Sequence, residues 1–242
     1  MLGQVRGIDH AVILVRDLDR ACDTYARMGF TLTPRGHHSL GSQNHCIMFG
    51  RDYLELMALP AVPPAAFRFF ADFLAKREGV GALALAVDDA AAARADLTQA
   101  GIAAEAPLAL SRPVENLGEA RFTLVQLPPA ETPGFRTFLC AHHTRDIVWR
   151  PEYQRHANGA AEIRSVTVAT SEPARYARLF DGLPVKYVHA DAPAVAAIRI
   201  RVGDKKAASE SLKRGGFSPV ELKGGALAVA ANQAHGILLV FD

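Results

Sequence analysis

The pattern of apolar and polar positions repeats along the chain. The first copy begins with an apolar strand at Ile8–Val15, which is followed by Asp17 and an amphipathic helix through Met28. Gly29 and a second strand at Phe30–Thr33 come next. Asp before a helix accepts hydrogen bonds from its first N–H groups, and Gly just past the end adopts the left-handed conformation that stops it. The pattern therefore predicts a strand–helix–strand unit.

Three further copies of this unit follow, each with an apolar strand, a capping residue, a helix, a Gly and a second strand. The caps are Asp88, Ser171 and Asp204, the first strands Gly81–Val87, Ile163–Ala169 and Ala197–Val202, and the second strands Ile102–Glu105, Val185–His189 and Phe217–Leu222. Self-similarity of this kind indicates a fold that is built from repeated supersecondary units.

Additional strands distinguish the copies from one another. The first copy continues into a hairpin of Asn44–Phe49 and Tyr53–Leu59, and the second continues into Arg121–Leu127 and Phe138–His142. Each of these two copies therefore has the order βαβββ, which predicts an α+β fold. The third copy either lacks the hairpin or shares a strand with the fourth copy, which regains the hairpin near the end of the chain. The second half of the protein is thus a truncated version of the first.

The intervals between the copies predict the domain organisation. Residues 1–145 should form a pair of βαβββ modules, residues 146–160 a linker, and residues 161–242 a shorter related half. A stripe of Phe residues within 63–79 has helical spacing and predicts a packed helix that connects the first two modules.

Composition narrows the class of protein. The chain has 242 residues, is 50% hydrophobic and carries a net charge of +2 from 27 basic and 25 acidic residues. This balance argues against a nucleic-acid partner, and no apolar run is long enough to span a membrane. The three cysteines lie far apart, so neither a disulfide framework nor a cysteine zinc site is indicated. We expect a cytoplasmic protein with a small-molecule substrate, and a homodimer is left open.

The first module resembles the vicinal-oxygen-chelate superfamily, which includes glyoxalase I, extradiol dioxygenases and bleomycin-resistance proteins. The resemblance rests on Ile8-Asp9-His10-Ala11-Val12 and on Tyr53-Leu54-Glu55-Leu56. The stretches 38–45, 149–151 and 156–159 are similar to a bacterial branch with a glyoxalase-like domain. The resemblance implies curled mixed sheets that form a cup with helices outside. It also implies that His10 and Glu55 are metal ligands.

Strand parity predicts which side chains face the cup. If Gly50-Arg51 is a two-residue hairpin loop, the direct partners follow from it. They are Met48 with Tyr53, Cys46 with Glu55, and Asn44 with Met57. Asn44, Cys46, Tyr53 and, from the second module, Cys140 are therefore expected to bind substrate beside Glu55. His45 should point to the helices, and His156 in the linker should be a local hydrogen-bonding residue.

The second module offers fewer of the expected metal ligands than the first. The resemblance would place another His near Gly81 or Ala82 and another Glu at Cys140, so the first of these ligands is missing. Cys140 or His142 could serve as the third ligand, and the predicted set is His10, Glu55 and His142. Imidazole and carboxylate ligands suit a divalent ion such as Zn, Mn, Fe or Ni.

Three functions compete. The leading hypothesis is a glyoxalase-type lyase or isomerase, in which a divalent ion holds neighbouring oxygens of a small substrate and Glu55 is a ligand or catalytic proton shuttle. The second is a metal-free protein that sequesters a small molecule or confers resistance to it. The third, a ring-cleaving dioxygenase, is disfavoured because Ser165 and Val240 stand where the second half would need ligands.

Overall fold

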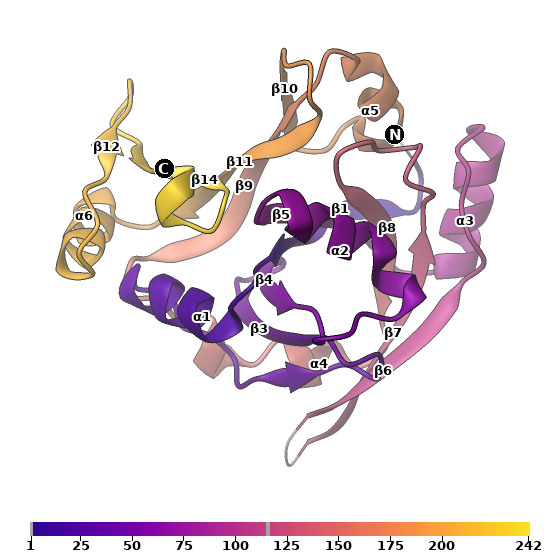
Figure 1. Ribbon diagram of the computed structural model, residues 1–242, viewed down its shortest axis with the longest axis horizontal. Coiled ribbons are helices and arrows are strands. Elements are labelled where there is room, and N and C mark those ends of the chain that lie inside the picture. Colours follow the sequence, from indigo (N-terminus) through magenta and orange to yellow (C-terminus); the bar gives the residue numbers. More distant parts are fainter. Residues whose placement is uncertain (1, 115–116) are drawn as a thin grey trace.

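A computed structural model describes residues 2–114 and 117–242 as two curled mixed sheets with helices on their outer faces (Figure 1). The first sheet has the strand order β2-β3-β4-β1-β5-β8-β7-β6. Its strands are β1 (Val5–Leu14), β2 (Gly36–His37), β3 (Gln43–Met48), β4 (Tyr53–Ala58), β5 (Gly79–Val87), β6 (Leu108–Val114), β7 (Gly118–Gln126) and β8 (Arg136–His142). The α+β class predicted from the sequence is confirmed.

The first sheet is built from two related halves. Strands β1 and β5 pair antiparallel at its centre, and each pairs on its other side with a parallel strand, β4 for β1 and β8 for β5. The edge strands β2 and β6 contact each other across the concave face. This arrangement nearly closes the sheet into a cup.

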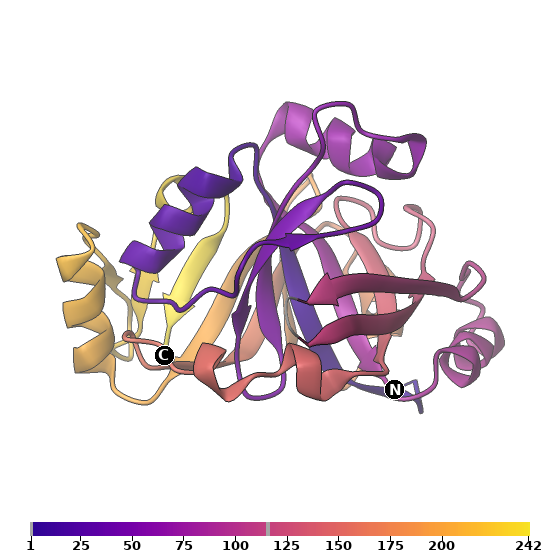
Figure 2. The same cartoon turned by 90° about the horizontal axis from the view of Figure 1, so that it is seen from below.

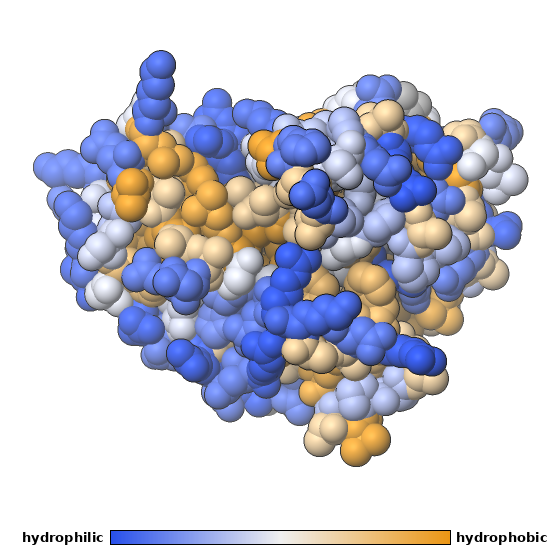
Figure 3. Space-filling view, turned by 45° about the horizontal axis from the view of Figure 1, so that its top comes forward, coloured by the Kyte–Doolittle hydropathy of each residue, from blue (hydrophilic) through white to orange (hydrophobic). Residues whose placement is uncertain are grey.

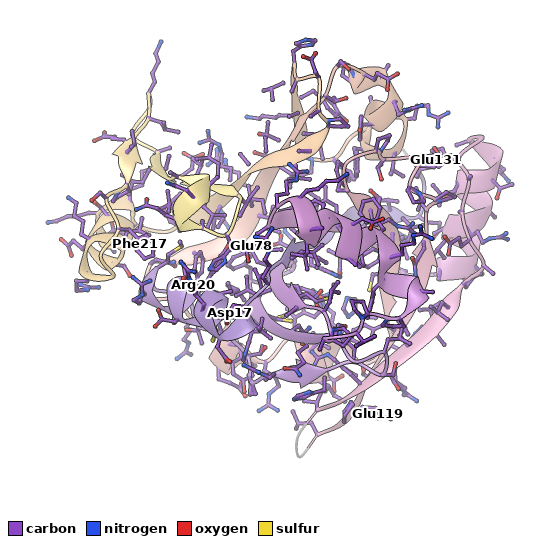
Figure 4. All side chains as sticks on the ribbon, in the orientation of Figure 1. Asp17, Arg20, Glu78, Glu119, Glu131 and Phe217 are labelled. Atoms are coloured by element: carbon purple, nitrogen blue, oxygen red, sulfur yellow. The ribbon has the colours of Figure 1, made fainter. Side chains whose placement is uncertain are left out.

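Three helices cover the convex side or its rim, namely α1 (Leu18–Arg27), α2 (Arg68–Lys76) and α3 (Ala90–Gln99). The carboxylate of Asp17 accepts a hydrogen bond from the backbone N–H of Arg20, as the predicted cap requires (Figure 4). Asp89 caps α3 rather than the predicted Asp88, because the carboxylate of Asp89 reaches the N–H groups of Ala91 and Ala92. The helix start is therefore one residue later than predicted.

The second sheet has the order β10-β9-β11-β14-β13-β12. Its strands are β9 (Ala160–Ala169), β10 (Val185–Val188), β11 (Ala194–Val202), β12 (Val220–Glu221), β13 (Leu227–Val229) and β14 (Leu238–Phe241), with helices α5 (Pro173–Phe180) and α6 (Lys205–Arg214). Asp204 caps α6 as predicted, whereas Glu172 occupies the N-cap position of α5 without a side-chain cap in place of the predicted Ser171. The domain boundaries drawn from the sequence stay a prediction.

Two predicted strands are not strands. Phe30–Thr33 and Ile102–Glu105 each follow a helix, but their backbone groups make single hydrogen bonds instead of a ladder. The N–H of Thr33 donates to the carbonyl of Cys46, and that of Glu105 donates to Gln126. The edge strands β2 and β6 begin a few residues later.

The linker joins the two sheets. It contains α4 (Arg145–Val148) and a short 3₁₀ turn at Pro151–Tyr153, and Figure 2 shows it in salmon, passing beneath the strands. One ring nitrogen of His156 lies 3.0 Å from the backbone nitrogen of Thr31, and the other lies 2.9 Å from the carbonyl oxygen of Met48. His156 is thus a hydrogen-bonding residue as predicted, but its partners are not local, since both lie in the first module.

The main hydrophobic core lies between the helices and the convex faces of both sheets. In β14, Leu239 and Phe241 point into this core, whereas Leu238 and Val240 belong to a small apolar cluster on the other face. Figure 3 shows a hydrophobic area on its left side, where Figure 1 places these C-terminal strands. No helix in the described part of the chain is long and apolar enough to cross a membrane.

Candidate functional site

A cavity opens on the concave face of the first sheet. Its walls are mostly apolar and include rings from the connecting segment and from β7 and β8. The apolar lining includes Val12, Leu40, Met57, Ala66, Phe67, Phe70, Leu108, Leu110, Phe122, Leu124 and Phe138. The polar lining includes His10, His38, Asn44, Glu55, Arg112, Gln126 and Arg136. A concave, mainly apolar pocket with a few converging polar groups is typical of a small-molecule site.

The register of the β3–β4 hairpin is as predicted. Cys46 pairs with Glu55, Met48 with Tyr53, and Asn44 with Met57. Asn44, Cys46, Tyr53, Glu55 and, from β8, Cys140 all line the cavity. His45 does not line it, and its Nδ1 lies 2.8 Å from the carbonyl oxygen of Thr33. The facing of these side chains is therefore confirmed, while their roles stay predictions.

Asp9 is a site residue that the sequence analysis missed. Strand parity would place it on the opposite face from His10, but the β1–β5 pairing has a register shift between Ile8 and His10. Such a bulge re-aims the extra side chain. Asp9 is fully buried, and its Oδ2 lies 2.6 Å from His10 Nδ1 and 2.9 Å from His142 Nε2. The only sequence signal was an acid inside an apolar strand.

Electrostatics keep Asp9 ionised. Burial opposes ionisation, but hydrogen bonds from His10 and His142 outweigh it and hold the pKa of Asp9 at about 2. An ionised carboxylate only accepts hydrogen bonds, so Nδ1 of His10 donates to it. In a neutral ring, the lone pair of His10 is then on Nε2, the atom that faces Glu55.

Glu55 is held from two sides. Nδ2 of Asn44 donates a hydrogen bond of 2.6 Å to Oε1 of Glu55, and His10 Nε2 lies 3.5 Å from Oε2. The Glu55 side chain is 8% exposed. His38 also lines the cavity, and its Nε2 lies 3.9 Å from Glu55 Oε1. A nearly buried carboxylate therefore faces two imidazoles.

Tyr53 and two cysteines pack tightly around the site, and burial keeps the two thiols protonated. Tyr53 stacks on the His10 ring with centroids 4.3 Å apart. Burial raises the pKa of Cys46 to about 12 and the pKa of Cys140 well above its ordinary value. Neither cysteine is therefore a ready thiolate at neutral pH.

His142 lies behind the cavity. Its ring packs edge-on against Phe122 and Trp149, and it is not among the lining residues. Ligand atoms of Asp9, Cys140 and His142 lie within 4.8 Å of one another. His142 thus belongs to the same polar cluster as His10, but through Asp9 rather than by facing Glu55.

The two halves of the sheet place different residues at corresponding positions. The two central strands are related by a pseudo-two-fold axis, which carries the irregularity at Asp9 in β1 onto that at Gly81 in β5 and the helix cap Asp17 onto Asp89. Ala82 therefore occupies the position that corresponds to His10, as predicted, whereas Ala84 is the direct cross-strand partner of His10. An Ala side chain has no atom that can coordinate a metal.

The residues of the first half fit a divalent metal ion. Nε2 of His10 and Oε2 of Glu55 converge at 3.5 Å, while Asp9 and Asn44 occupy the other polar atoms of the two side chains. Metal-bound histidines commonly donate their second ring N–H to a carboxylate, as His10 does here. These two atoms would hold the ion, with the cavity open for a substrate.

Comparison with solved structures supports the fold. A hypothetical protein from Staphylococcus aureus aligns with a TM-score of 0.72 at 12% identity, covering 98% of both chains. The Mn(II)-bound glyoxalase from Novosphingobium aromaticivorans aligns with a TM-score of 0.63 at 12% identity, covering 98% of this chain and 82% of that one. Homoprotocatechuate 2,3-dioxygenase from Brevibacterium fuscum gives 0.60 at 14% identity, covering 99% and 81%.

No curated protein sequence matches this chain. The family described as "Glyoxalase-like domain" matches residues 8–183, which is most of the chain and includes both modules of the first sheet. The match, the cup of paired modules and the structural neighbours agree with one another. The chain belongs to the glyoxalase-like domain family, within the vicinal-oxygen-chelate superfamily.

Proposed function

We propose that the protein is a metal-dependent lyase or isomerase that acts on a small substrate with neighbouring oxygens. The observation that carries this proposal is the convergence of His10 Nε2 and Glu55 Oε2 in the cavity, 3.5 Å apart. A divalent ion held there would polarise a substrate oxygen as a Lewis acid. Zn, Mn, Fe and Ni are all compatible with one imidazole and one carboxylate.

Each neighbouring residue has a definite task in this proposal. Asp9 fixes the tautomer and the orientation of His10 through Nδ1. Asn44 fixes one oxygen of Glu55 and leaves Oε2 directed at His10. Tyr53 stacks on His10 and prevents the ring from turning.

Glu55 is also the proposed proton carrier. Its carboxylate is nearly buried in the cavity, where a proton could be taken from a substrate carbon next to a carbonyl group and returned to the neighbouring carbon. The apolar walls limit the access of water, which favours transfer between substrate and Glu55. The same carboxylate can be a ligand or a base, and the metal-binding experiment below separates the first role from the second.

The metal bound by one structural neighbour is consistent with the proposed divalent ion. The glyoxalase from Novosphingobium aromaticivorans is a Mn(II)-bound protein whose fold matches this chain over 98% of its length. At 12% identity this likeness concerns the fold alone. The donor atoms of His10 and Glu55 are the independent reason to expect a divalent ion here.

A metal-free binding protein is the second candidate. Ala82 occupies the position that corresponds to His10, and the cavity wall is mostly apolar. Two protein ligands leave most coordination positions to water or substrate, which favours weak metal binding. This candidate would use the cavity only to enclose a small molecule.

Metal titration of chelator-treated protein tests the proposal. Isothermal titration calorimetry with Mn²⁺ and Zn²⁺ should show one site per chain, and Glu55→Gln and His10→Ala should each lower its affinity by more than about 100-fold. His143→Ala is the matched control, because His143 is exposed and contacts Thr123 instead of the cavity. Wild-type protein that binds neither ion, or variants that bind like wild type, would leave the metal-free candidate.

A further inference from the structure

One cationic side chain of the cavity has no partner among the residues that the structure describes. Arg112 is half-buried, lines the cavity, and makes no hydrogen bond or ion pair within the described residues. The other lining arginine is different, because Arg136 donates to Gln126 Oε1 at 2.9 Å and lies 3.4 Å from Glu105 Oε1. Arg112 is therefore the lining guanidinium that is free to bind a ligand.

The position of Arg112 is set by the edge strand β6. Leu108, Leu110 and Arg112 alternate along this strand and point to the cavity, and Arg112 pairs with Ala120 in β7. Strands β6 and β7 form a hairpin, and Figure 4 labels Glu119, which precedes Ala120 in β7, near its tip. The guanidinium thus lies where β6 closes over the cup.

Gly36 makes room for this guanidinium on the opposite edge strand. A Cβ at Gly36 would lie 3.3 Å from Arg112 Nη1 and only 2.2 Å from Asn44 Oδ1. Arg112 Nη1 and Asn44 Oδ1 therefore both lie next to the backbone of Gly36, at the polar end of the cavity. Arg112 and the Asn44–Glu55 pair are therefore near neighbours.

The surroundings of Arg112 define what could bind it. Glu55 is the one carboxylate among the described lining residues, and Asn44 and His10 already contact it. A guanidinium in a mainly apolar cavity is stabilised by an anion, and its planar fork matches a carboxylate with two parallel hydrogen bonds. Phe122 and Phe138 supply flat apolar walls for the remainder of such a ligand.

We propose that Arg112 is an anion-binding subsite and that the ligand is a small organic acid with an apolar, ring-sized body. The carboxylate binds Arg112, the body lies between the Phe rings, and an oxygen-bearing group is directed at His10 and Glu55. Only this last contact rests on the proposed metal-dependent function. A monoanion fits best, because Arg112 is the one unpaired guanidinium among the described lining residues and Arg136 is already paired.

Binding of simple acids to metal-free protein tests the proposal. In the presence of EDTA, calorimetry with benzoate, phenylacetate and 3-phenylpropanoate is compared with their carboxamides, which have the same shape without the charge. At least one acid should bind about tenfold more tightly than its amide, as expected for charge-assisted hydrogen bonds. Arg112→Gln should remove this preference, and Arg112→Lys should keep the charge but lose several-fold in affinity.

The control and the refuting outcomes are specific. Arg68→Gln removes an exposed arginine near Phe67 and Phe70 that does not line the cavity, so it should leave the preference unchanged. Equal binding of every acid and its amide, or a preference that survives in Arg112→Gln, would overturn the proposal. Tighter, Arg112-dependent binding of phenyl phosphate than of any acid would overturn the carboxylate assignment. Because no metal is present, these results are independent of the His10–Glu55 site.

Discussion

Asp52 joins the two sheets, and its replacement by Asn should stabilise the protein, most strongly above neutral pH. Oδ1 of Asp52 accepts a hydrogen bond of 2.8 Å from the backbone N–H of Ile163 in β9, and the residue is 4% exposed. Burial raises the pKa of Asp52 from 3.8 to about 7, and the nearby charge of Glu162 adds to this effect, although the hydrogen bond from Ile163 opposes it. The folded protein therefore favours the protonated form.

The sign and the magnitude follow from proton linkage. Between pH 3.8 and about 7 the folded state binds more protons at Asp52 than the unfolded state, so stability falls as the pH rises through this window and levels off above it. At 1.36 kcal/mol for each pH unit, the raised pKa lowers the stability, relative to that below pH 3.8, by about 4 kcal/mol at pH 8 and by about 1.5 kcal/mol at pH 5. Asn keeps an oxygen for Ile163 and carries no charge.

Urea unfolding of wild type and Asp52→Asn at pH 5 and pH 8 measures this difference. The variant should be more stable at both values, and its advantage should be larger at pH 8 by about 2–3 kcal/mol. Asp72→Asn is the control, because Asp72 is exposed on α2 and should show no such trend. An Asp52→Asn variant that is no more stable than wild type at pH 8, or whose advantage is independent of pH, would refute the reasoning.

Two further predictions concern packing and the candidate site. Gly215→Ala should destabilise the protein by about 1–3 kcal/mol, since its Cβ would lie 1.8 Å from the carbonyl oxygen of Arg27, whereas Gly203→Ala meets nothing within 4 Å and should be tolerated. Thermal melts compare the two, and equal melting temperatures would contradict the close approach. Asp9→Asn should weaken Mn²⁺ binding by about 10–100-fold, because His10 loses its charged partner. Calorimetry measures this change, and an unaltered affinity would show that His10 does not depend on Asp9.

The sequence was sufficient for the β3–β4 register. A two-residue loop at Gly50-Arg51 fixes every pair along the hairpin, so Asn44 and Cys46 could be assigned to the same face as Glu55. This inference needs only the length of the loop and the alternation of side chains. It is local, and no distant part of the chain can change it.

The positions of Asp9 and Arg112 in the site could not be predicted from loop length and side-chain alternation. Asp9 faces His10 because of a bulge that arises where β1 pairs with β5, which is a partner about seventy residues away. Arg112 lies on β6, an edge strand whose sequence Leu-Ala-Leu-Ser-Arg-Pro-Val contains a Pro and has little strand signal beyond its first residues. Its place in the cavity depends on the approach of β2 across the cup. Both contacts are properties of the assembled sheet.

The repeat itself explains why the candidate site is asymmetric. Across the central β1–β5 pair, His10 corresponds to Ala82, and the parallel strands then relate Glu55 to Phe138. The imidazole and the carboxylate of the first module are thus matched by apolar side chains in the second. One module supplies the ionisable groups, and the other supplies an apolar wall and the free guanidinium of β6. A site with this division of roles can hold the reactive end of a ligand on one side and its body on the other.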